Sequence, residues 1–374
     1  MFQQSSYSEQ FTFFQKLRSF DFILVLCVLI LGLVSNLSMF STDGGEFLYH
    51  TKSHLIRFVV FFILMLFLSF FSLRFWHSTA YLFYIVVLGF LIWASLYGVT
   101  ASGSQRWINL YFINLQPSEL MKIAIIVCFA RFFHREQITS VSSFKNIIVS
   151  LAILVMPIVL VVSQPDLGTS ILIAASGLIV LWLAGLNIRY FVYSGLILLV
   201  SFPFVISFLK PYQKLRILSF FNPDRDPLGA GYQIIQSKIA VGSGGLLGKG
   251  FLQGTQSYLE FLPEKHTDFI FTLFSEEQGF VGSVFLLIIY GILIYRIIKI
   301  GSISRSYFGR LFCYGFGSAI FVYITVNMSM VLGLVPIVGS PLPIMSYGGS
   351  SMLATMIGLS IVMSSKIYNK QQIA

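Results

Sequence analysis

The sequence predicts an all-α integral membrane protein in which about ten helices cross the bilayer. Its 374 residues are 56% hydrophobic and only 10% charged, whereas a soluble chain averages about 25% charged residues. The apolar runs are long and continuous, while a transmembrane barrel would show alternating segments of about 10 residues. The 39 Phe and 18 Tyr residues suit lipid-facing and interfacial positions. These observations favour a single polytopic membrane domain over residues 1–374.

The predicted spans follow from the length that a helix needs to cross a bilayer, which is about 20 mostly apolar residues. The segment Met1–Ser19 is polar and aromatic, so the first apolar run is expected to be a retained span and not a cleaved signal. The ten predicted spans are Phe22–Phe40, Leu55–Leu73, Ala80–Tyr97, Ser118–Phe133, Ile147–Val162, Gly168–Ala184, Tyr190–Phe208, Phe269–Ile294, Phe308–Leu332 and Ser350–Ser365.

The basic residues predict the orientation of these spans. An even number of spans places both termini on one side, and the short segments on the other side hold only Lys52, Arg57 and Arg106. By the positive-inside rule both termini are therefore cytoplasmic. Most acidic residues fall on the extracytoplasmic side, where acid–base chemistry is expected. The net charge of +10 does not indicate nucleic-acid binding, because the basic residues are scattered in short loops.

A large extracytoplasmic loop, residues 209–267, joins the seventh and eighth spans and is too long for a plain connector. The segment Tyr232–Val241 is amphipathic and predicts a short interfacial helix, and the loop is expected to fold back as a cap. Gly242–Gly250 resembles a phosphate-binding loop, but Gly250 follows Lys249 where Ser or Thr is required. Two interpretations stay open for it: a flexible turn, or a backbone nest that meets a pyrophosphate group together with Lys249.

The loop ends in a charged stretch, Glu264 to Asp268, where the eighth apolar run begins. A carboxylate at the boundary between water and lipid is costly to place, and is a functional candidate for that reason. Asp268 is either the N-cap of the eighth span or a general base flanked by Lys265 and His266. Glu264 and His266 are likewise either solvated loop residues or part of a site.

Polar residues also open the fourth and sixth spans. Glu119 and Lys122 are three residues apart, so they share one helix face and can pair. Such a pair is costly in a bilayer unless it is matched or lines a wet cavity, so it is either a structural ion pair or a cavity wall. Asp166 is better explained as a helix cap than as a catalyst. Pro336–Pro343 and Ser346–Ser351 break the apolar pattern, and such backbone must be buried in protein or line a cavity.

The cysteines and most of the histidines show no metal-ligand spacing. The three cysteines fall inside apolar runs and predict neither a disulfide nor a metal site. Four histidines are too dispersed to suggest a metal cluster and are interpreted as interfacial: His50, His54, His77 and His134.

Seven segments of the chain resemble the SEDS family (shape, elongation, division and sporulation). They occur in the family's order and span most of the chain, and their details favour the rod-shape (RodA) branch over the division (FtsW) branch. The segments are Arg106–Leu110, Gln116–Lys122, Gln164–Thr169, Tyr232–Lys238, Gly248–Gln256, Phe261–Phe271 and Pro343–Ser350.

The resemblance implies a peptidoglycan glycosyltransferase of the bacterial cytoplasmic (inner) membrane that polymerises lipid II during elongation and rod-shape maintenance. By resemblance, Asp268 deprotonates the 4-hydroxyl of the acceptor sugar on the extracytoplasmic face. That oxygen attacks C1 of the donor and expels the polyprenyl pyrophosphate with inversion. Glu119 and Lys122 match a family pair that lines the central cavity. A class B penicillin-binding protein and other elongation-complex proteins are implied as partners.

The remaining candidate residues are expected to bind the charged groups of the substrate or to line its cavity. Arg106, Lys238, Lys249 and Lys265 are candidate cations for the pyrophosphate. Asp166, Glu264, His266 and Ser350 complete the candidate substrate cavity. A divalent cation, Mg²⁺ or Mn²⁺, could assist the leaving group, but no dedicated metal site and no organic cofactor are expected. Two other functions stay open: a lipid II flippase, and a scaffold that positions a penicillin-binding protein.

Overall fold

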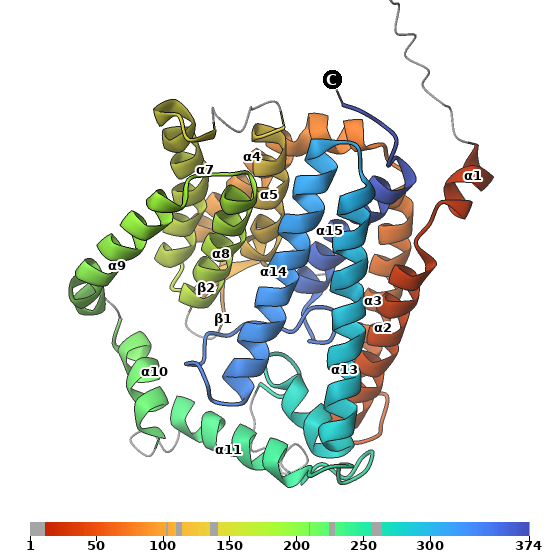
Figure 1. The fold of residues 1–374 in the computed structure, drawn as a ribbon. Coiled ribbons are helices and arrows are strands. Elements are labelled where there is room, and N and C mark those ends of the chain that lie inside the picture. Colours follow the sequence, from red (N-terminus) through yellow and green to blue (C-terminus); the bar gives the residue numbers. More distant parts are fainter. Residues whose placement is uncertain are drawn as a thin grey trace, which may run out of the picture.

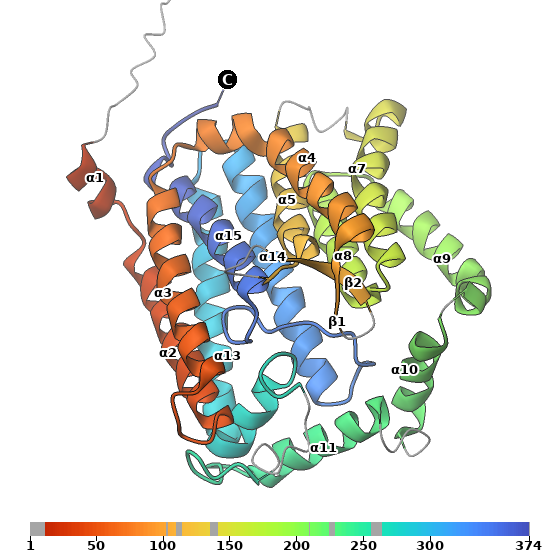
Figure 2. The ribbon, with the colours of Figure 1, turned by 180° about the vertical axis from the view of Figure 1, so that it is seen from behind.

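The structure, a computed structural model, describes residues 12–101, 104–109, 114–134, 141–208, 210–223, 229–255 and 264–373. Each of the ten predicted spans corresponds to a helix, and all of these helices except the one at Tyr190–Phe208 pack into a bundle (Figures 1 and 2). The ten helices are α2 (Phe22–Thr42), α3 (Tyr49–Ser69), α4 (Leu73–Tyr97), α5 (Pro117–Phe132), α7 (Phe144–Ser163), α8 (Leu167–Leu183), α9 (Ile188–Phe208), α13 (Ile270–Ile303), α14 (Tyr307–Val331) and α15 (Gly349–Ile367).

Seven of the described helices, namely α2, α3, α4, α7, α13, α14 and α15, are long and apolar enough to cross a membrane. The chain is therefore a multi-pass membrane protein. Several boundaries differ from the prediction: α3 and α4 begin one to two turns early, and α13 extends to Ile303. These extra turns contain polar residues such as Lys52 and Arg74, which hydropathy excludes from a span although a helix end at the membrane surface accommodates them.

Helix α5 lies at the centre of the bundle, which explains why it is both short and charged. All of its residues from Pro117 to Ala130 are buried. Helices α4, α8, α14 and α15 pack around it. Its ionisable residues are therefore surrounded by protein and not by lipid, as intramembrane charges usually are.

The described part of the loop between α9 and α13 contains two helices, which run along the side and the end of the bundle (Figure 1). Helix α11 (Ala230–Ser243) confirms the predicted short helix at Tyr232–Val241. Helix α10 (Pro211–Phe221) was not predicted, although proline at its first position is a helix-start signal. The backbone N–H of Lys210, its N-cap, donates a hydrogen bond to Gln213 Oε1 at 2.9 Å. Residues 224–228 and 256–263, which include part of the predicted turn and Phe261–Pro263, lie outside the described residues.

The glycine-rich segment Gly244–Gly250 docks on a kink in α13. Helix α13 is interrupted at Gly279, which has φ 66°. Phe280 and Val281 donate backbone hydrogen bonds to the carbonyls of Gly245 (2.9 Å) and Leu246 (3.1 Å). In return, the Lys249 N–H donates to the Glu276 carbonyl at 3.0 Å and the Gly250 N–H donates to the Glu277 carbonyl at 3.1 Å. The N–H groups of Gly248, Lys249 and Gly250 are therefore used by backbone carbonyls, which argues against a nest that meets a pyrophosphate at this end of the segment. The turn interpretation is confirmed, and its flexibility stays a prediction.

A small antiparallel sheet between α4 and α5 was also not predicted. Its strands are β1 (Val99–Ala101), β2 (Ser104–Asn109) and β3 (Asn114–Leu115), in the order β1-β2-β3. Leu110, at the end of one resemblance segment, lies outside the described residues. The sheet matters because β2 carries Arg106.

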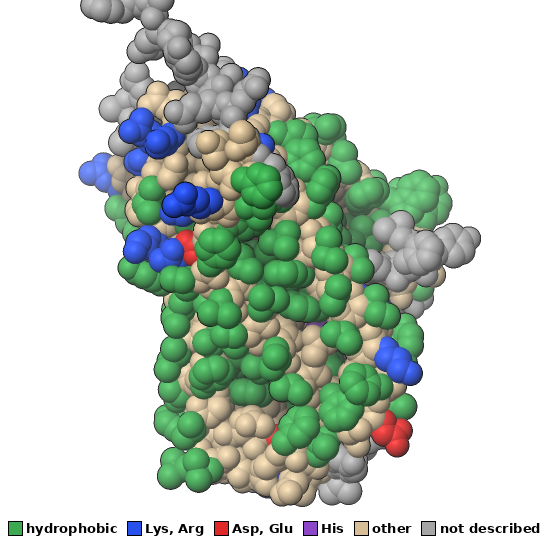
Figure 3. Space-filling view, turned by 90° about the vertical axis from the view of Figure 1, so that its right-hand side faces the viewer, with side chains coloured by type: hydrophobic (Ala, Val, Ile, Leu, Met, Phe, Trp, Pro, Cys, Tyr) green, Lys and Arg blue, Asp and Glu red, His purple; other side chains and the backbone are tan. Residues whose placement is uncertain are grey.

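The surface is divided between an apolar belt and a basic end. Figure 3 shows hydrophobic side chains over most of one face, while most of its Lys and Arg side chains gather toward the end of the bundle from which the N-terminal segment extends. The C-terminal segment ends on this same side (Figure 1). The three cysteines are free and buried, as expected.

Candidate functional site

Asp268 lies in the turn of residues 264–269, directly before α13. Figure 2 shows this turn in the half of the bundle that is away from the C-terminus. The N-cap interpretation is wrong, because α13 begins at Ile270 with Phe269 as its N-cap and without a side-chain cap. The backbone of Asp268 is held from α14: Asn327 Nδ2 donates to the carbonyl oxygens of Asp268 at 2.9 Å and of Ser340 at 2.6 Å. The Asp268 carboxylate accepts no hydrogen bond from the described residues, so it is available to a substrate.

The surroundings of Asp268 favour its protonated form. Burial, followed by the negative charge of Glu264, raises the pKa of Asp268 to about 7. The guanidinium groups of Arg106 and Arg216 act in the opposite direction. The residue is half-buried and so keeps contact with water. A carboxylate with a pKa near neutrality is suited to general-base catalysis.

Arg106 and Asp166 form one polar network close to Asp268. Asp166 caps α8, as predicted, by accepting hydrogen bonds from Thr169 N (3.1 Å) and Thr169 Oγ1 (2.9 Å). Its second oxygen also lies 3.0 Å from Arg106 Nη1 and accepts a hydrogen bond from Gln116 Nε2 at 3.0 Å. Asp166 therefore holds the Arg106 side chain in place, and both of its own carboxylate oxygens already have hydrogen-bond or ion-pair partners.

Ser350 ties this network to the last helix. Its hydroxyl accepts a hydrogen bond from Gln116 N at 2.7 Å and donates one to the Asn114 carbonyl at 3.2 Å. Since Gln116 is the N-cap of α5, Ser350 joins β3, α5 and α15. Its role in this structure is to hold these elements together.

Glu119 and Lys122 pair inside the bundle, with Lys122 Nζ 2.8 Å from Glu119 Oε2. The ammonium also lies over the ring of Tyr323, 4.6 Å from its centroid. Both residues line a small pocket that is closed by Pro341 and Pro343. The ion-pair interpretation is therefore confirmed. The pocket has room for about one water molecule, so the interpretation of the pair as the wall of a substrate cavity stays a prediction.

The segment between α14 and α15 connects the pocket with Asp268. Residues Leu342–Ser346 are buried, as predicted for non-helical backbone at membrane depth. A Cβ on Gly339 would lie 3.4 Å from Asp268 Oδ2. One segment thus contacts the Asp268 carboxylate at Gly339 and the Glu119–Lys122 pocket at Pro341 and Pro343.

The predicted cations do not all act at the same place. Lys249 Nζ lies 2.6 Å from Glu276 Oε1 and 2.8 Å from Thr255 Oγ1, so its charge is neutralised within the loop. Lys238 is exposed on α11, and Lys265 is half-buried beside His266. Sequence reasoning missed Arg216, which acts on Asp268 and donates to the Ile337 carbonyl at 3.4 Å. It was missed because α10, which carries it, was not predicted.

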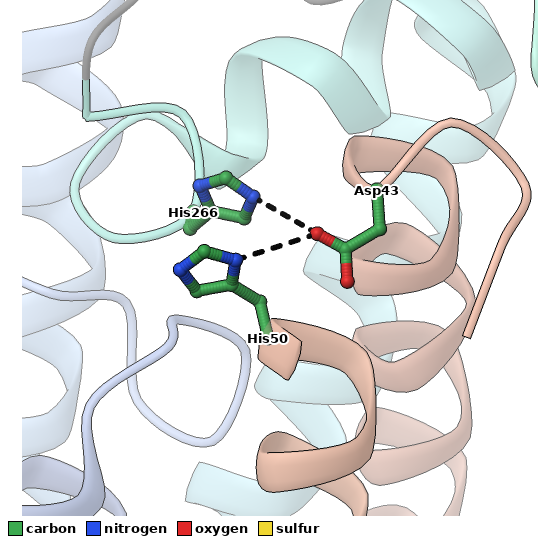
Figure 4. Close-up of side chains that lie close together, drawn as sticks. All are labelled: Asp43, His50 and His266. Atoms are coloured by element: carbon green, nitrogen blue, oxygen red, sulfur yellow. Dashed lines mark ion pairs between the residues drawn. The ribbon is translucent and has the colours of Figure 1, made fainter. Parts of the chain in front are cut away.

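The histidines were interpreted incorrectly in two cases. His54 is buried and hydrogen-bonded to Ser35 at 2.5 Å, so it is not interfacial. His50 is not dispersed, because it meets His266 and Asp43, three residues whose ligand atoms all lie within 4.8 Å of one another (Figure 4). Burial, then the charges of His50 and Lys265, lower the pKa of His266 against the opposing effect of Asp43.

Comparisons with known proteins show what this chain resembles. The chain is 47% identical over 288 residues to peptidoglycan glycosyltransferase MrdB of Escherichia coli (strain K12), covering 77% of each protein. It is 37% identical over 273 residues to stage V sporulation protein E of Bacillus subtilis (strain 168), covering 73% of this chain and 74% of that relative.

Two solved structures share the fold. A chain from the work titled "Structural coordination of polymerization and crosslinking by a peptidoglycan synthase complex" matches with a TM-score of 0.80 at 30% identity, covering 94% of this chain and 99% of that one. The rod shape determining protein RodA of Thermus thermophilus matches with a TM-score of 0.71 at 24% identity, covering 94% of this chain and 98% of that one. The family model FTSW_RODA_SPOVE, described as "Cell cycle protein", matches residues 18–371, and the chain therefore belongs to this family, the SEDS family.

Proposed function

We propose that this chain is a peptidoglycan glycosyltransferase that polymerises lipid II into glycan strands during cell elongation. Family membership and the name of the relative at 47% identity support the activity. The observation that carries the mechanism is the Asp268 carboxylate, which is half-buried, has a pKa raised to about 7 and lies beside two arginines.

In the proposed reaction, Asp268 accepts the proton of the acceptor 4-hydroxyl as that oxygen bonds to C1 of the donor sugar. The bond from C1 to the pyrophosphate oxygen breaks, and the polyprenyl pyrophosphate leaves with the electron pair. An α-linked donor gives a β-1,4 product by direct displacement, so no covalent glycosyl-enzyme is required. Arg106 and Arg216 supply positive charge near Asp268, where it would stabilise the leaving group.

A divalent cation, Mg²⁺ or Mn²⁺, is part of this proposal. Among the described residues, no group of three ligands includes Asp268. Mg²⁺ is commonly held by one or two carboxylates together with substrate phosphates, and the substrate's pyrophosphate would supply most of its ligands. Together with the two arginines, the ion would stabilise the negative charge of the leaving pyrophosphate.

In this proposal, the ten helices that match the ten predicted spans all cross the bacterial cytoplasmic membrane. They form one domain, with both termini in the cytoplasm. The active site then faces the extracytoplasmic side, where the cell wall is built. A class B penicillin-binding protein is the proposed partner, which would cross-link the new glycan. The solved relative in a peptidoglycan synthase complex supports a partnership of this kind.

The test is polymerisation of labelled lipid II by the purified protein in detergent, alone and with the partner. Asp268→Asn should lower the rate by about 100-fold or more, as loss of a general base does. Glu46→Gln is the matched control, because Glu46 is an exposed carboxylate at the same end of the bundle; it should retain the parent rate.

Three outcomes would contradict the proposal. Equal polymer from Asp268→Asn and from the parent would remove Asp268 from the chemistry. Movement of labelled lipid II across vesicles without polymer would favour a flippase. Polymer that depends on the partner's own glycosyltransferase site would favour a scaffold.

A further inference from the structure

We propose that Asp43, His50 and His266 form a binding site for a divalent transition-metal ion of the zinc type. The site lies where the α2–α3 connection meets the turn before α13 (Figure 4). It is separate from any ion carried by the pyrophosphate, and the inference does not depend on the proposed glycosyl transfer.

Two of the three separations between the ligand atoms suit such an ion, and all three lie within 4.8 Å. Asp43 Oδ1 lies 3.5 Å from His50 Nδ1 and 3.4 Å from His266 Nε2. Zinc holds nitrogen and oxygen ligands at about 2.0–2.2 Å, and the edge of a tetrahedron of that size is about 3.4 Å. Both distances from the carboxylate oxygen therefore match a tetrahedral edge and are long for hydrogen bonds.

The carboxylate is already oriented for this role. Asp43 Oδ2 accepts hydrogen bonds from Thr51 N at 2.9 Å and from Thr51 Oγ1 at 2.6 Å. These bonds use the outer oxygen and leave Oδ1 directed at the two imidazoles. Partners that hold a ligand in this way are typical of metal sites.

The two imidazoles are also held in position. Their rings stack with centroids 4.2 Å apart, and Figure 4 shows one nitrogen of each ring directed at the same carboxylate oxygen. The Tyr347 N–H donates to the His266 carbonyl at 2.8 Å. His266 Nε2 is buried, and its one ion-pair contact among the described residues, Asp43 Oδ1 at 3.4 Å, does not have the geometry of a hydrogen bond. A metal ion between the two atoms would complete both.

The donor set selects the kind of ion. Two imidazoles and one carboxylate suit zinc and related transition metals, whereas Mg²⁺ prefers oxygen ligands. Three protein ligands leave a fourth tetrahedral position for water. The side chain of His50 is 41% exposed, so an ion can reach the site from solvent.

The ion would have a positioning role for the neighbouring site. Its ligands come from the C-terminus of α2, the first turn of α3 and the turn that carries Asp268. His266 precedes Asp268 by two residues, so binding would fasten this turn to the α2–α3 hairpin. None of the three ligands is assigned a part in the proton transfer.

The test uses the full chain in detergent, without a histidine tag and stripped of metal by a chelator. Zinc binding is followed by titration calorimetry, and bound metal is measured by elemental analysis. The parent protein should bind one equivalent of Zn²⁺, and zinc should raise its thermal unfolding midpoint. The double variant His50→Gln/His266→Gln should bind at least 100-fold more weakly, while His77→Gln should bind as the parent does.

Zinc-edge X-ray absorption of the loaded parent protein gives a measurement that needs no variant. Two imidazole nitrogens among the ligands at about 2.0–2.2 Å are expected. The inference is overturned if the parent binds no zinc, if the zinc lacks imidazole ligands, or if the folded double variant binds zinc as tightly as the parent. The first result would leave a histidine–aspartate ion pair in place of a metal site.

Discussion

At the residue scale, Asp166 and Asp268 show how far identical side chains in similar sequence positions can differ. Each precedes an apolar helix; the sequence favoured a capping role for Asp166 and left capping and general-base catalysis both open for Asp268. Asp166 sits directly at the start of α8 and accepts hydrogen bonds or an ion pair at both oxygens. Asp268 stands one residue farther from its helix, which leaves its carboxylate unused by the fold. That single residue of spacing separates a structural carboxylate from a candidate base.

The Glu119–Lys122 pair provides a prediction at the same scale. Glu119→Ala and Lys122→Ala should each destabilise the protein by about 3–5 kcal/mol, because the remaining charge is buried without its partner. The double variant Glu119→Gln/Lys122→Met should recover thermal stability but not lipid II polymerisation, since the pocket loses both charges. Thermal unfolding and polymerisation rate are the measurements. Unchanged stability and activity in either single variant would remove the pair from both the fold and the mechanism.

At the scale of elements, the kink in α13 and the glycine-rich turn are one feature. Gly279 has φ 66° and ψ −161°, a conformation that is essentially restricted to glycine. Ser41 donates a hydrogen bond to the Glu277 carboxylate, and Lys249 pairs with Glu276. The two glutamates therefore hold the turn and α2 against the kink.

Gly279→Ala should disrupt this junction. The new Cβ would lie 2.2 Å from Gly248 N, and the strained backbone alone costs about 1–3 kcal/mol. The expected result is a lower thermal midpoint together with faster protease cleavage within residues 229–255.

Gly291→Ala in the same helix is the matched control. Nothing lies within 4 Å of its Cβ position, so this variant should be neutral or stabilised by up to about 1 kcal/mol. If both variants unfold at the parent's temperature, the kink does not depend on glycine.

The sequence predicted these elements to different degrees, for physical reasons. Burial in lipid or protein requires long apolar runs, so each of the ten predicted spans corresponds to a helix. The sheet and α10 contain no such run, and their stability comes from contacts that are distant in sequence. The docking of the turn at Gly244–Gly250 could not be predicted, because its hydrogen-bond partners in α13 are distant in sequence.

At the scale of the whole molecule, the candidate site is assembled from segments spread along the chain. Arg106, Asp166 and Asp268 were each proposed from local patterns, and the fold brings their charges close enough to influence one another. The Asp43–His50–His266 cluster could not be predicted in this way, since no spacing relates the three residues. Candidate residues could thus be chosen from the sequence. Which of them lie together is determined by the packing of the helices, which the sequence alone did not predict.

The orientation of the bundle in the membrane provides the last prediction. The parent cysteines are all buried, so single cysteines introduced at exposed positions can be labelled above a low background. Glu46 and Lys370 are both exposed and lie at opposite ends of the bundle. Glu46→Cys should react with a membrane-impermeant maleimide in intact spheroplasts, and Lys370→Cys only after permeabilisation. The reverse pattern would place Asp268 in the cytoplasm, away from the wall, and would exclude the proposed reaction there.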